Sequence, residues 1–265
     1  MLHFESAMNK ILFKSFNPYE DRFPNRKVLS RADINLMKYF RSKDYEVIVE
    51  PEDEFPVHML TQKNFIEYLP TVLELAGNLS IGVISGLIAN YLSKDFAKSN
   101  SDEFIIKQGE RIYSKSGESL SEKEANQKLN SAMNVRKQFG EAFERESPYE
   151  DSPYPLFWEH SGVIIGWCSV DVDEQGLFIK SGRLTSVEAT EAIGNGSLQG
   201  FSIGGLVKKP ICSVCHSNYI DCQHFAGRSY HGDMCVNQLT EIDLAEISLV
   251  KSPANALTGI DFKKM

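Results

Sequence analysis

The chain has 265 residues, which is enough for one large domain or two modest ones with a hydrophobic core. Hydrophobic residues make up 42% of it and charged residues 24%, the usual balance of a globular protein. The net charge of −8 argues against a general nucleic-acid-binding protein, because no basic surplus exists to neutralise phosphates.

Residues 1–147 predict an accessory α+β domain, and no secretory leader follows Met1, so we expect a cytoplasmic protein. Residues 10–16 have a pattern typical of either a short strand or a helical turn. Apolar residues at helical spacing predict a helix over 32–40. Residues 45–50 are rich in β-forming side chains and predict a strand.

Residues 75–92 carry no charge and are almost long enough to span a bilayer. They contain Gly82-x-x-x-Gly86, a small-residue pattern on which helices pack closely. However, the segment holds two asparagines and two serines, and no basic cluster flanks it to set an orientation. We therefore expect a buried helix packed against the strand at 45–50, and no membrane partner.

A hairpin and a long helix are predicted next. Residues 104–107 and 111–115 flank a Gln-Gly turn and predict the hairpin. Ser121 with Glu124 forms a capping box that would begin the helix, and the pair two residues earlier fits one equally well. Apolar residues then recur at helical intervals to about residue 145.

Residues 146–155 are acidic and rich in proline, which favours a domain linker. We place the boundary there, with a second domain over 154–265. Apolar residues after the boundary alternate as in strands, with a short helix at 187–193. The predicted strands are 163–172, 177–180, 183–185, 201–208 and 239–250.

The stretch S-L-Q-G-F-S-I-G-G-L, residues 197–206, sets Ser202 between two apolar residues and among glycines. An extended chain would bury Phe201 and Ile203 on one face and turn the hydroxyl to the other. Nearby glycines leave backbone amides unshielded, and those at Gly204 and Gly205 are candidates to receive an oxyanion. The alternative is an ordinary serine in a glycine-rich turn.

Two further residues fit a nucleophilic serine. His160 follows an aromatic run and precedes a predicted strand. Glu246 lies in an apolar strand, where a carboxylate is costly unless it has a partner, and Asp243 and Glu241 lie near it. A serine, a histidine and a carboxylate are the parts of a base-activated nucleophile, whatever their order in the chain. Taken alone, His160 would more simply be a structural histidine.

Four short motifs occur together and in order: W-E-H, D-E-Q-G-L-F-I-K-S-G-R-L, L-Q-G-F-S-I-G and L-A-E-I-S-L-V-K-S-P-A-N-A. On these, the region over about 154–265 resembles the prohead (capsid maturation) serine proteases of tailed phages, distant relatives of the herpesvirus assemblins. The resemblance implies an antiparallel β-barrel with flanking helices. It also implies a serine endopeptidase in which Ser202 is the nucleophile, His160 the base and Glu246 the acid that orients it.

By the same resemblance, the substrates would be capsid or scaffold polypeptides, and the protein would act in the cytoplasm of a bacterial host or inside a procapsid. Whether it forms a homo-oligomer stays open. The family begins with strands that complete the barrel before the histidine, and this chain lacks that opening. Residues before Pro51 could supply those strands in altered form. Two other functions therefore stay open: an inactive structural or interaction protein on the same fold, and a protease repurposed for bacterial defence or signalling.

Residues 210–236 are inserted where the family has a shorter connection, and they hold four of the five cysteines. The two cysteines of a C-x-x-C pair can bind one metal ion from a tight turn, and a second pair of ligands completes its tetrahedral coordination. Four protein ligands leave no open position, so the predicted zinc would be structural. The expected ligands are three thiols and an imidazole, from Cys212, Cys215, Cys222 and His224. Cys235, His216 and His231 are alternates. A metal-free loop is the simpler interpretation.

Overall fold

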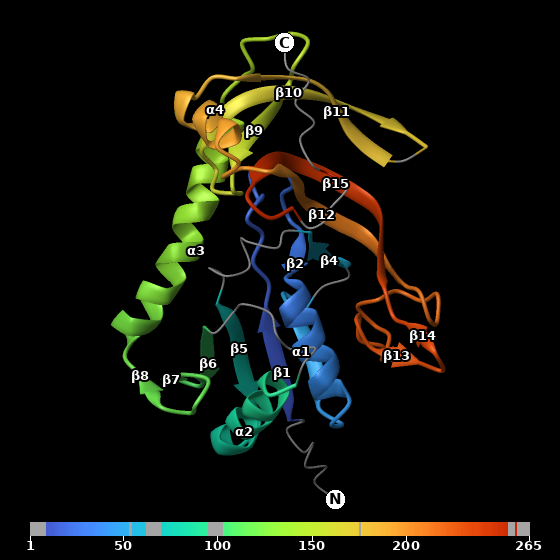
Figure 1. The fold of residues 1–265 in the computed structure, drawn as a ribbon. Helices are drawn as coiled ribbons and strands as arrows, with labels where there is room; N and C mark the ends of the chain where they lie inside the picture. The colour runs from blue at the N-terminus through green and yellow to red at the C-terminus, as the bar shows by residue number, and fades with distance from the viewer. Residues whose placement is uncertain are drawn as a thin grey trace, which may run out of the picture.

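The computed structural model describes residues 9–52, 55–61, 70–94, 103–174, 176–253 and 258. Over these residues the fold is mixed α+β, which confirms the predicted class (Figure 1). Its helices are α1 (Arg31–Arg41), α2 (Ile81–Leu92), α3 (Glu122–Phe143) and α4 (Val187–Gly194).

One sheet is built entirely from the first half of the chain. It contains both parallel and antiparallel strand pairs. The predicted strand at 45–50 and the hairpin are confirmed, and within residues 10–16 the segment Lys10–Lys14 forms a strand rather than a helical turn. In spatial order the strands are β3 (Glu46–Glu50), β1 (Lys10–Lys14), β5 (Thr71–Ala76), β6 (Phe104–Gln108), β7 (Arg111–Tyr113) and β8 (Ser119–Leu120).

A second sheet carries the motifs singled out above. Its strands, in spatial order, are β11 (Gly176–Leu184), β10 (Ile164–Asp173), β9 (Tyr154–Trp158), β15 (Asn237–Val250), β12 (Gly200–Cys212), β4 (Val57–Leu60) and β2 (Lys27–Leu29). A separate small ribbon pairs β13 (Ser229–Tyr230) with β14 (Asp233–Met234).

The expected closed antiparallel barrel is wrong for the residues that the structure describes. The second sheet is open, with β11 and β2 as its edges. Two of its pairs are parallel, β9 with β15 and β2 with β4. A closed barrel would need the two edge strands to pair with each other. Here β2 is only three residues long and most of β11 is exposed to solvent.

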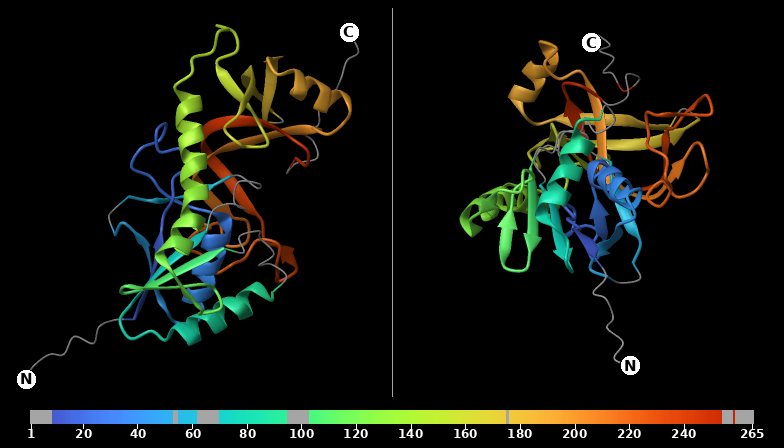
Figure 2. Two further views of the ribbon diagram at one scale, coloured as in Figure 1. Left: turned by 90° about the vertical axis from the view of Figure 1, so that its left-hand side faces the viewer. Right: turned by 90° about the horizontal axis from the view of Figure 1, so that it is seen from below.

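The predicted linker at 146–155 covers the loop between α3 and β9 and the first residues of β9. Residues on both sides of this loop build the second sheet, because β2 and β4 precede it and β4 pairs with β12. Helix α3 runs along the molecule from the first sheet to the second (Figure 2). The N-terminal half therefore supplies both strands and packing to the sheet that carries Ser202.

An aromatic cluster joins these parts. The fully buried rings of Tyr19 and Phe139 lie 5.2 Å apart at their centroids, and Phe139 lies 5.5 Å from Phe157. Tyr19 comes from the loop after β1, Phe139 from α3 and Phe157 from β9. Edge-to-face aromatic pairs of this kind stabilise a fold by more than their buried area alone, so the cluster holds the N-terminal loop against β9.

The predicted helix over 75–92 is correct only from Ile81 onward. Leu75 is a buried residue of β5, and the chain turns at Gly77, which has a φ of 81°. Helix α2 packs against α1 through one apolar face, whereas Gly82 and Gly86 are exposed. None of the helices in the described part of the chain is both long enough and apolar enough to cross a bilayer.

The helix starts follow local hydrogen-bond chemistry. The Ser121 side chain accepts from the N–H of Glu124, and the Glu124 carboxylate accepts from the N–H of Ser121, which confirms this capping box. The alternative start two residues earlier is wrong, because Ser119 belongs to β8. Ser30 and Asp33 form a second capping box at the start of α1.

Candidate functional site

Strands β12 and β15 form a long antiparallel pair in the second sheet. Ser202 lies directly opposite Ser248, and Gly204 lies opposite Glu246. Residues directly opposite each other share one face of the sheet, with Cβ atoms about 4.5–5.5 Å apart, and residues two apart on a strand share it too. The hydroxyls of Ser202 and Ser248 and the carboxylate of Glu246 are therefore on the same face.

A β-bulge lies beside this face. The register shifts between Gly204 and Gly205 and leaves Ala245 as the extra residue on β15. A Cβ on Gly205 would lie 2.3 Å from the carbonyl oxygen of Asp243, so only glycine fits this close approach. Arg22 donates a 3.0 Å hydrogen bond to the Ala245 carbonyl. The backbone next to the carboxylate is thus held from the N-terminal half of the chain.

His160 lies in a strained turn directly after β9. Strand β9 runs parallel to β15, with Phe157 opposite Ser248. Glu159 and His160 have φ values of 45° and 56°, a left-handed region that non-glycine residues seldom adopt. The Glu159 N–H donates to the Leu249 carbonyl at 3.0 Å and holds the turn against β15. Strain of this kind persists where surrounding contacts impose it, and it is common at functional sites.

The imidazole of His160 and the carboxylate of Glu246 form a buried pair. His160 Nδ1 lies 2.6 Å from Glu246 Oε1, and the two side chains are 1% and 0% exposed. The Ser248 hydroxyl donates a 2.6 Å hydrogen bond to Oε2 and accepts one of 3.2 Å from the His160 backbone N–H. Because Nδ1 is held by the carboxylate, Nε2 is the ring nitrogen that can act as a base.

Tyr19 contacts the same carboxylate from the N-terminal half. Its hydroxyl lies 3.5 Å from Glu246 Oε1, and the residue is completely buried. Burial, and then the negative charge of Glu246, raise the pKa of Tyr19 well above its ordinary value. The phenol therefore keeps its proton at neutral pH and can donate to the carboxylate.

The structure brings the predicted residues His160 and Glu246 into contact, and Ser202 lies half-buried on the face that Glu246 occupies. Sequence reasoning missed Ser248, although its position two residues after Glu246 on a strand already places it on the same face. Tyr19 had no sequence signal, because it is separated from Glu246 by 227 positions and lies in a loop.

The other two acidic residues of β15 form ion pairs near the protein surface. Asp243 forms a 2.9 Å ion pair with Lys208, and Glu241 forms one with Lys209. Neither pair involves His160, so Glu246 is the carboxylate that the structure places at the imidazole.

Comparisons of the chain with protein-family models, curated proteins and solved structures found no match. The resemblance to prohead proteases therefore rests on the four short motifs, and three of them carry His160, Ser202 and Glu246.

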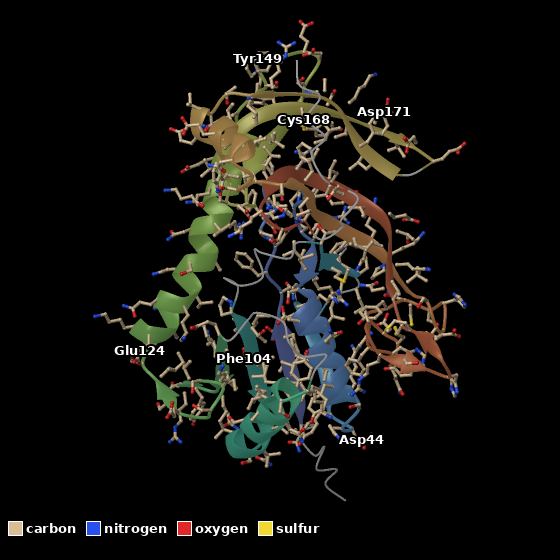
Figure 3. All side chains as sticks on the ribbon, viewed as in Figure 1. Asp44, Phe104, Glu124, Tyr149, Cys168 and Asp171 are labelled. Carbon is tan, nitrogen blue, oxygen red and sulfur yellow. The ribbon has the colours of Figure 1, made fainter. Side chains whose placement is uncertain are left out.

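A second group of chemically active side chains lies in the loop between β12 and β15, where sulfur atoms gather (Figure 3). One ligand atom from each of four residues lies within 4.8 Å of the others. Ligands of a tetrahedral zinc, about 2.3 Å from the ion for sulfur and 2.0–2.1 Å for nitrogen, lie about 3.5–3.8 Å apart. The group could hold a metal ion and is compatible with zinc; its members are Cys212, Cys215, Cys222 and His224.

Individual contacts agree with this description. Cys212 Sγ lies 3.6 Å from His224 Nδ1, close to a tetrahedral edge. Of the alternates, Cys235 has its Sγ 3.7 Å from that of Cys212, yet it lies outside the group of four. His216 and His231 lie outside it as well, so the four predicted ligands are the ones brought together.

The pKa values of Cys212 and of the alternate ligand Cys235 are shifted in opposite directions. Burial by itself would raise the pKa of Cys212, but hydrogen bonds from the backbone N–H groups of Cys215 and Val214 lower it to about 7. Burial and the neighbouring Cys212 raise the pKa of Cys235 to about 12. Because a metal binds the thiolate, Cys212 is better prepared as a ligand than Cys235.

Replacing Ser248 with alanine tests the hydrogen-bond network. Ser248→Ala removes the hydroxyl that donates to Glu246 Oε2 and accepts from the His160 N–H. We expect a loss of about 1–3 kcal/mol in the free energy of unfolding, measured by urea denaturation, because buried polar groups lose partners.

Ser202→Ala is the matched control, since it removes a hydroxyl from the directly opposite, half-buried position. We expect it to change stability by no more than about 0.5 kcal/mol. Equal effects of the two substitutions would contradict the network.

Proposed function

We propose that this protein is a serine endopeptidase in which Ser202 is the nucleophile, His160 the general base and Glu246 the residue that orients the imidazole. The main support is the buried 2.6 Å contact between His160 Nδ1 and Glu246 Oε1. It orients the ring through Nδ1, and in a triad the other ring nitrogen transfers the proton. The same face of the sheet carries the hydroxyl of Ser202.

The proposed reaction has two halves. Ser202 Oγ attacks the carbonyl carbon of a peptide bond while His160 Nε2 takes the hydroxyl proton. The C–N bond then breaks, and the imidazolium gives that proton to the leaving amine. Water then attacks the resulting ester, again with His160 as the base. This hydrolysis releases the new carboxyl group and restores the Ser202 hydroxyl. Throughout, Glu246 stabilises the charged imidazolium.

The network around Glu246 supports its role as an ionised carboxylate. Oε2 accepts from Ser248, and Oε1 is shared by His160 and Tyr19. Donors to both oxygens stabilise a negative charge that would otherwise be costly in an apolar strand. Amides around Gly204 and Gly205 are the candidates for the oxyanion, since neither residue has a side chain of its own, although both are buried in the sheet.

The substrate class comes from the resemblance. We infer capsid or scaffold polypeptides as substrates and phage maturation as the setting, on the four motifs that the chain has in common with prohead proteases. On this proposal, the open sheet that contains β12 and β15 is the counterpart of the barrel in that family.

Ser202→Ala tests the nucleophile directly. Wild type and variant are incubated with a scaffold protein and with a defined peptide library, and the products are identified by mass spectrometry. We expect the variant to lose cleavage by a factor of about 10³ or more, because the nucleophile cannot be replaced by its surroundings. Ser181→Ala, at an exposed position on β11, should cleave at the wild-type rate.

Cleavage of the same bonds by Ser202→Ala at the wild-type rate would contradict the proposal. A second function, a non-catalytic interaction protein on the same fold, is favoured by one observation: His160 is only 2% exposed. That function predicts no cleavage by any form of the protein, so the wild-type assay separates the two.

We also propose that the cysteine loop binds a structural zinc through Cys212, Cys215, Cys222 and His224. The support is their mutual proximity and the edge-like distance between Cys212 and His224. The ion would supply folding free energy to a loop whose only regular structure is the small ribbon of β13 and β14. Four protein ligands argue against a catalytic metal.

Metal content tests the zinc proposal. Elemental analysis of the purified protein should give about one zinc per chain. Cys215→Ser should lose most of it, because one of four ligands is removed. Cys168→Ala is the control: Cys168 is buried in β10, away from the loop, and its loss should leave the zinc in place. Wild-type protein without zinc after expression in zinc-supplemented medium would contradict the proposal.

A further inference from the structure

Helix α1 turns a buried lysine toward the cysteine loop. Lys38 is only 3% exposed, and its Nζ donates a 2.8 Å hydrogen bond to the His224 carbonyl. The same atom lies 3.5 Å from Cys222 Sγ and 3.2 Å from the centre of the Tyr219 ring. The ammonium group is thus surrounded by parts of the proposed metal loop, although it comes from the other half of the chain.

A buried ammonium group is costly unless its charge is compensated. In the part of the chain that the structure describes, the contacts of Lys38 Nζ are a carbonyl, a thiol and aromatic faces. A carbonyl and a ring face each compensate only part of a positive charge. A negatively charged group in the loop would therefore complete the environment of Lys38.

The proposed metal centre supplies that charge. Three thiolates, a neutral imidazole and a divalent zinc ion carry a net charge of −1, and one ammonium group brings the sum to zero. We propose that Lys38 is the charge-balancing partner of the metal centre, positioning Cys222 and His224, and that the bound ion in turn holds α1 against the loop. This inference rests on the zinc proposal above.

The rest of the α1 surface supports the second part of the inference. Asn35, Lys38 and Arg41 follow one another at intervals of three residues and so share one face of the helix. Asn35 Oδ1 accepts a 2.9 Å hydrogen bond from the Tyr219 hydroxyl, and Arg41 donates one of 3.3 Å to the Ile220 carbonyl. Each of the three residues contacts the loop, and Lys38 is the one beside the sulfur ligands.

Apolar packing extends the contact. One hydrophobic cluster includes residues of α1 together with residues of the loop, among them Met37, Phe40, Tyr219 and Phe225. Figures 1 and 2 show the loop lying beside α1. The loop holds little regular structure of its own, so an ion that orders it would also order the surface on which α1 packs.

Zinc affinity, measured by competition with a chromophoric chelator, tests the role of Lys38. Lys38→Met keeps an unbranched side chain, one heavy atom shorter, and removes the charge. We expect it to weaken zinc binding about 10- to 100-fold, the usual effect of losing a partner of the metal ligands. Lys43→Met, at an exposed position just beyond α1, should bind zinc as wild type does, and Lys38→Arg should recover part of the affinity.

Hydrogen exchange measured on the wild-type protein tests the same inference and does not depend on whether a variant folds. After zinc is removed by a chelator, amides of α1 should exchange faster, whereas those of α3 in residues 129–136 should change little. Unchanged zinc affinity in Lys38→Met, or unchanged exchange in α1, would overturn the inference while leaving the zinc proposal intact. Wild-type protein that binds no zinc would overturn both.

Discussion

The structure depends most on the buried contact between Glu246 and His160. An ionised carboxylate in the middle of an apolar strand is tolerated only if its oxygens are hydrogen-bonded. Here Ser248 donates to one oxygen, and His160 and Tyr19 approach the other. The bulge in β15, the parallel pairing of β9 and the left-handed turn at His160 all serve to bring these groups together.

The two halves of the chain are joined at this site and at the cysteine loop. Tyr19 from the N-terminal half reaches Glu246, and β2 and β4 extend the sheet beside β12. Lys38 on α1 reaches Cys222 of the group that could hold a metal ion. The N-terminal half is therefore part of the environment of both candidate centres rather than a separate appendage. A deletion of residues 1–147 would remove Tyr19 and Phe139 and expose Phe157, Leu206 and Ala245, which are buried in the same cluster.

Features determined by short-range patterns could be predicted from the sequence. The alternation of apolar residues located β12 and β15 closely, and a serine with a glutamate three residues later located the start of α3 to within two residues. The C-x-x-C spacing located the group of side chains that could hold a metal ion. Ser248 could also have been predicted, because residues two apart on a strand share a face.

Features that depend on distant pairing could not be predicted. Local patterns do not reveal that β9 pairs parallel to β15, or that β4 joins β12, and these pairings make the sheet open rather than closed. Nor does an uncharged run reveal where a strand ends and a helix begins, as at residues 75–92. Tyr19 and Lys38 gain their roles only from packing between the halves.

In the proposed mechanism, Glu246 and His160 activate the hydroxyl of Ser202. The most direct measurement needs no knowledge of the substrate: the native protein is treated with a fluorophosphonate probe, digested, and mapped by mass spectrometry. We expect one probe per chain on Ser202, with labelling of Glu246→Gln slower by a factor of about 10³ or more. An unlabelled Ser202 in the wild-type protein, or equal labelling rates in both forms, would contradict it.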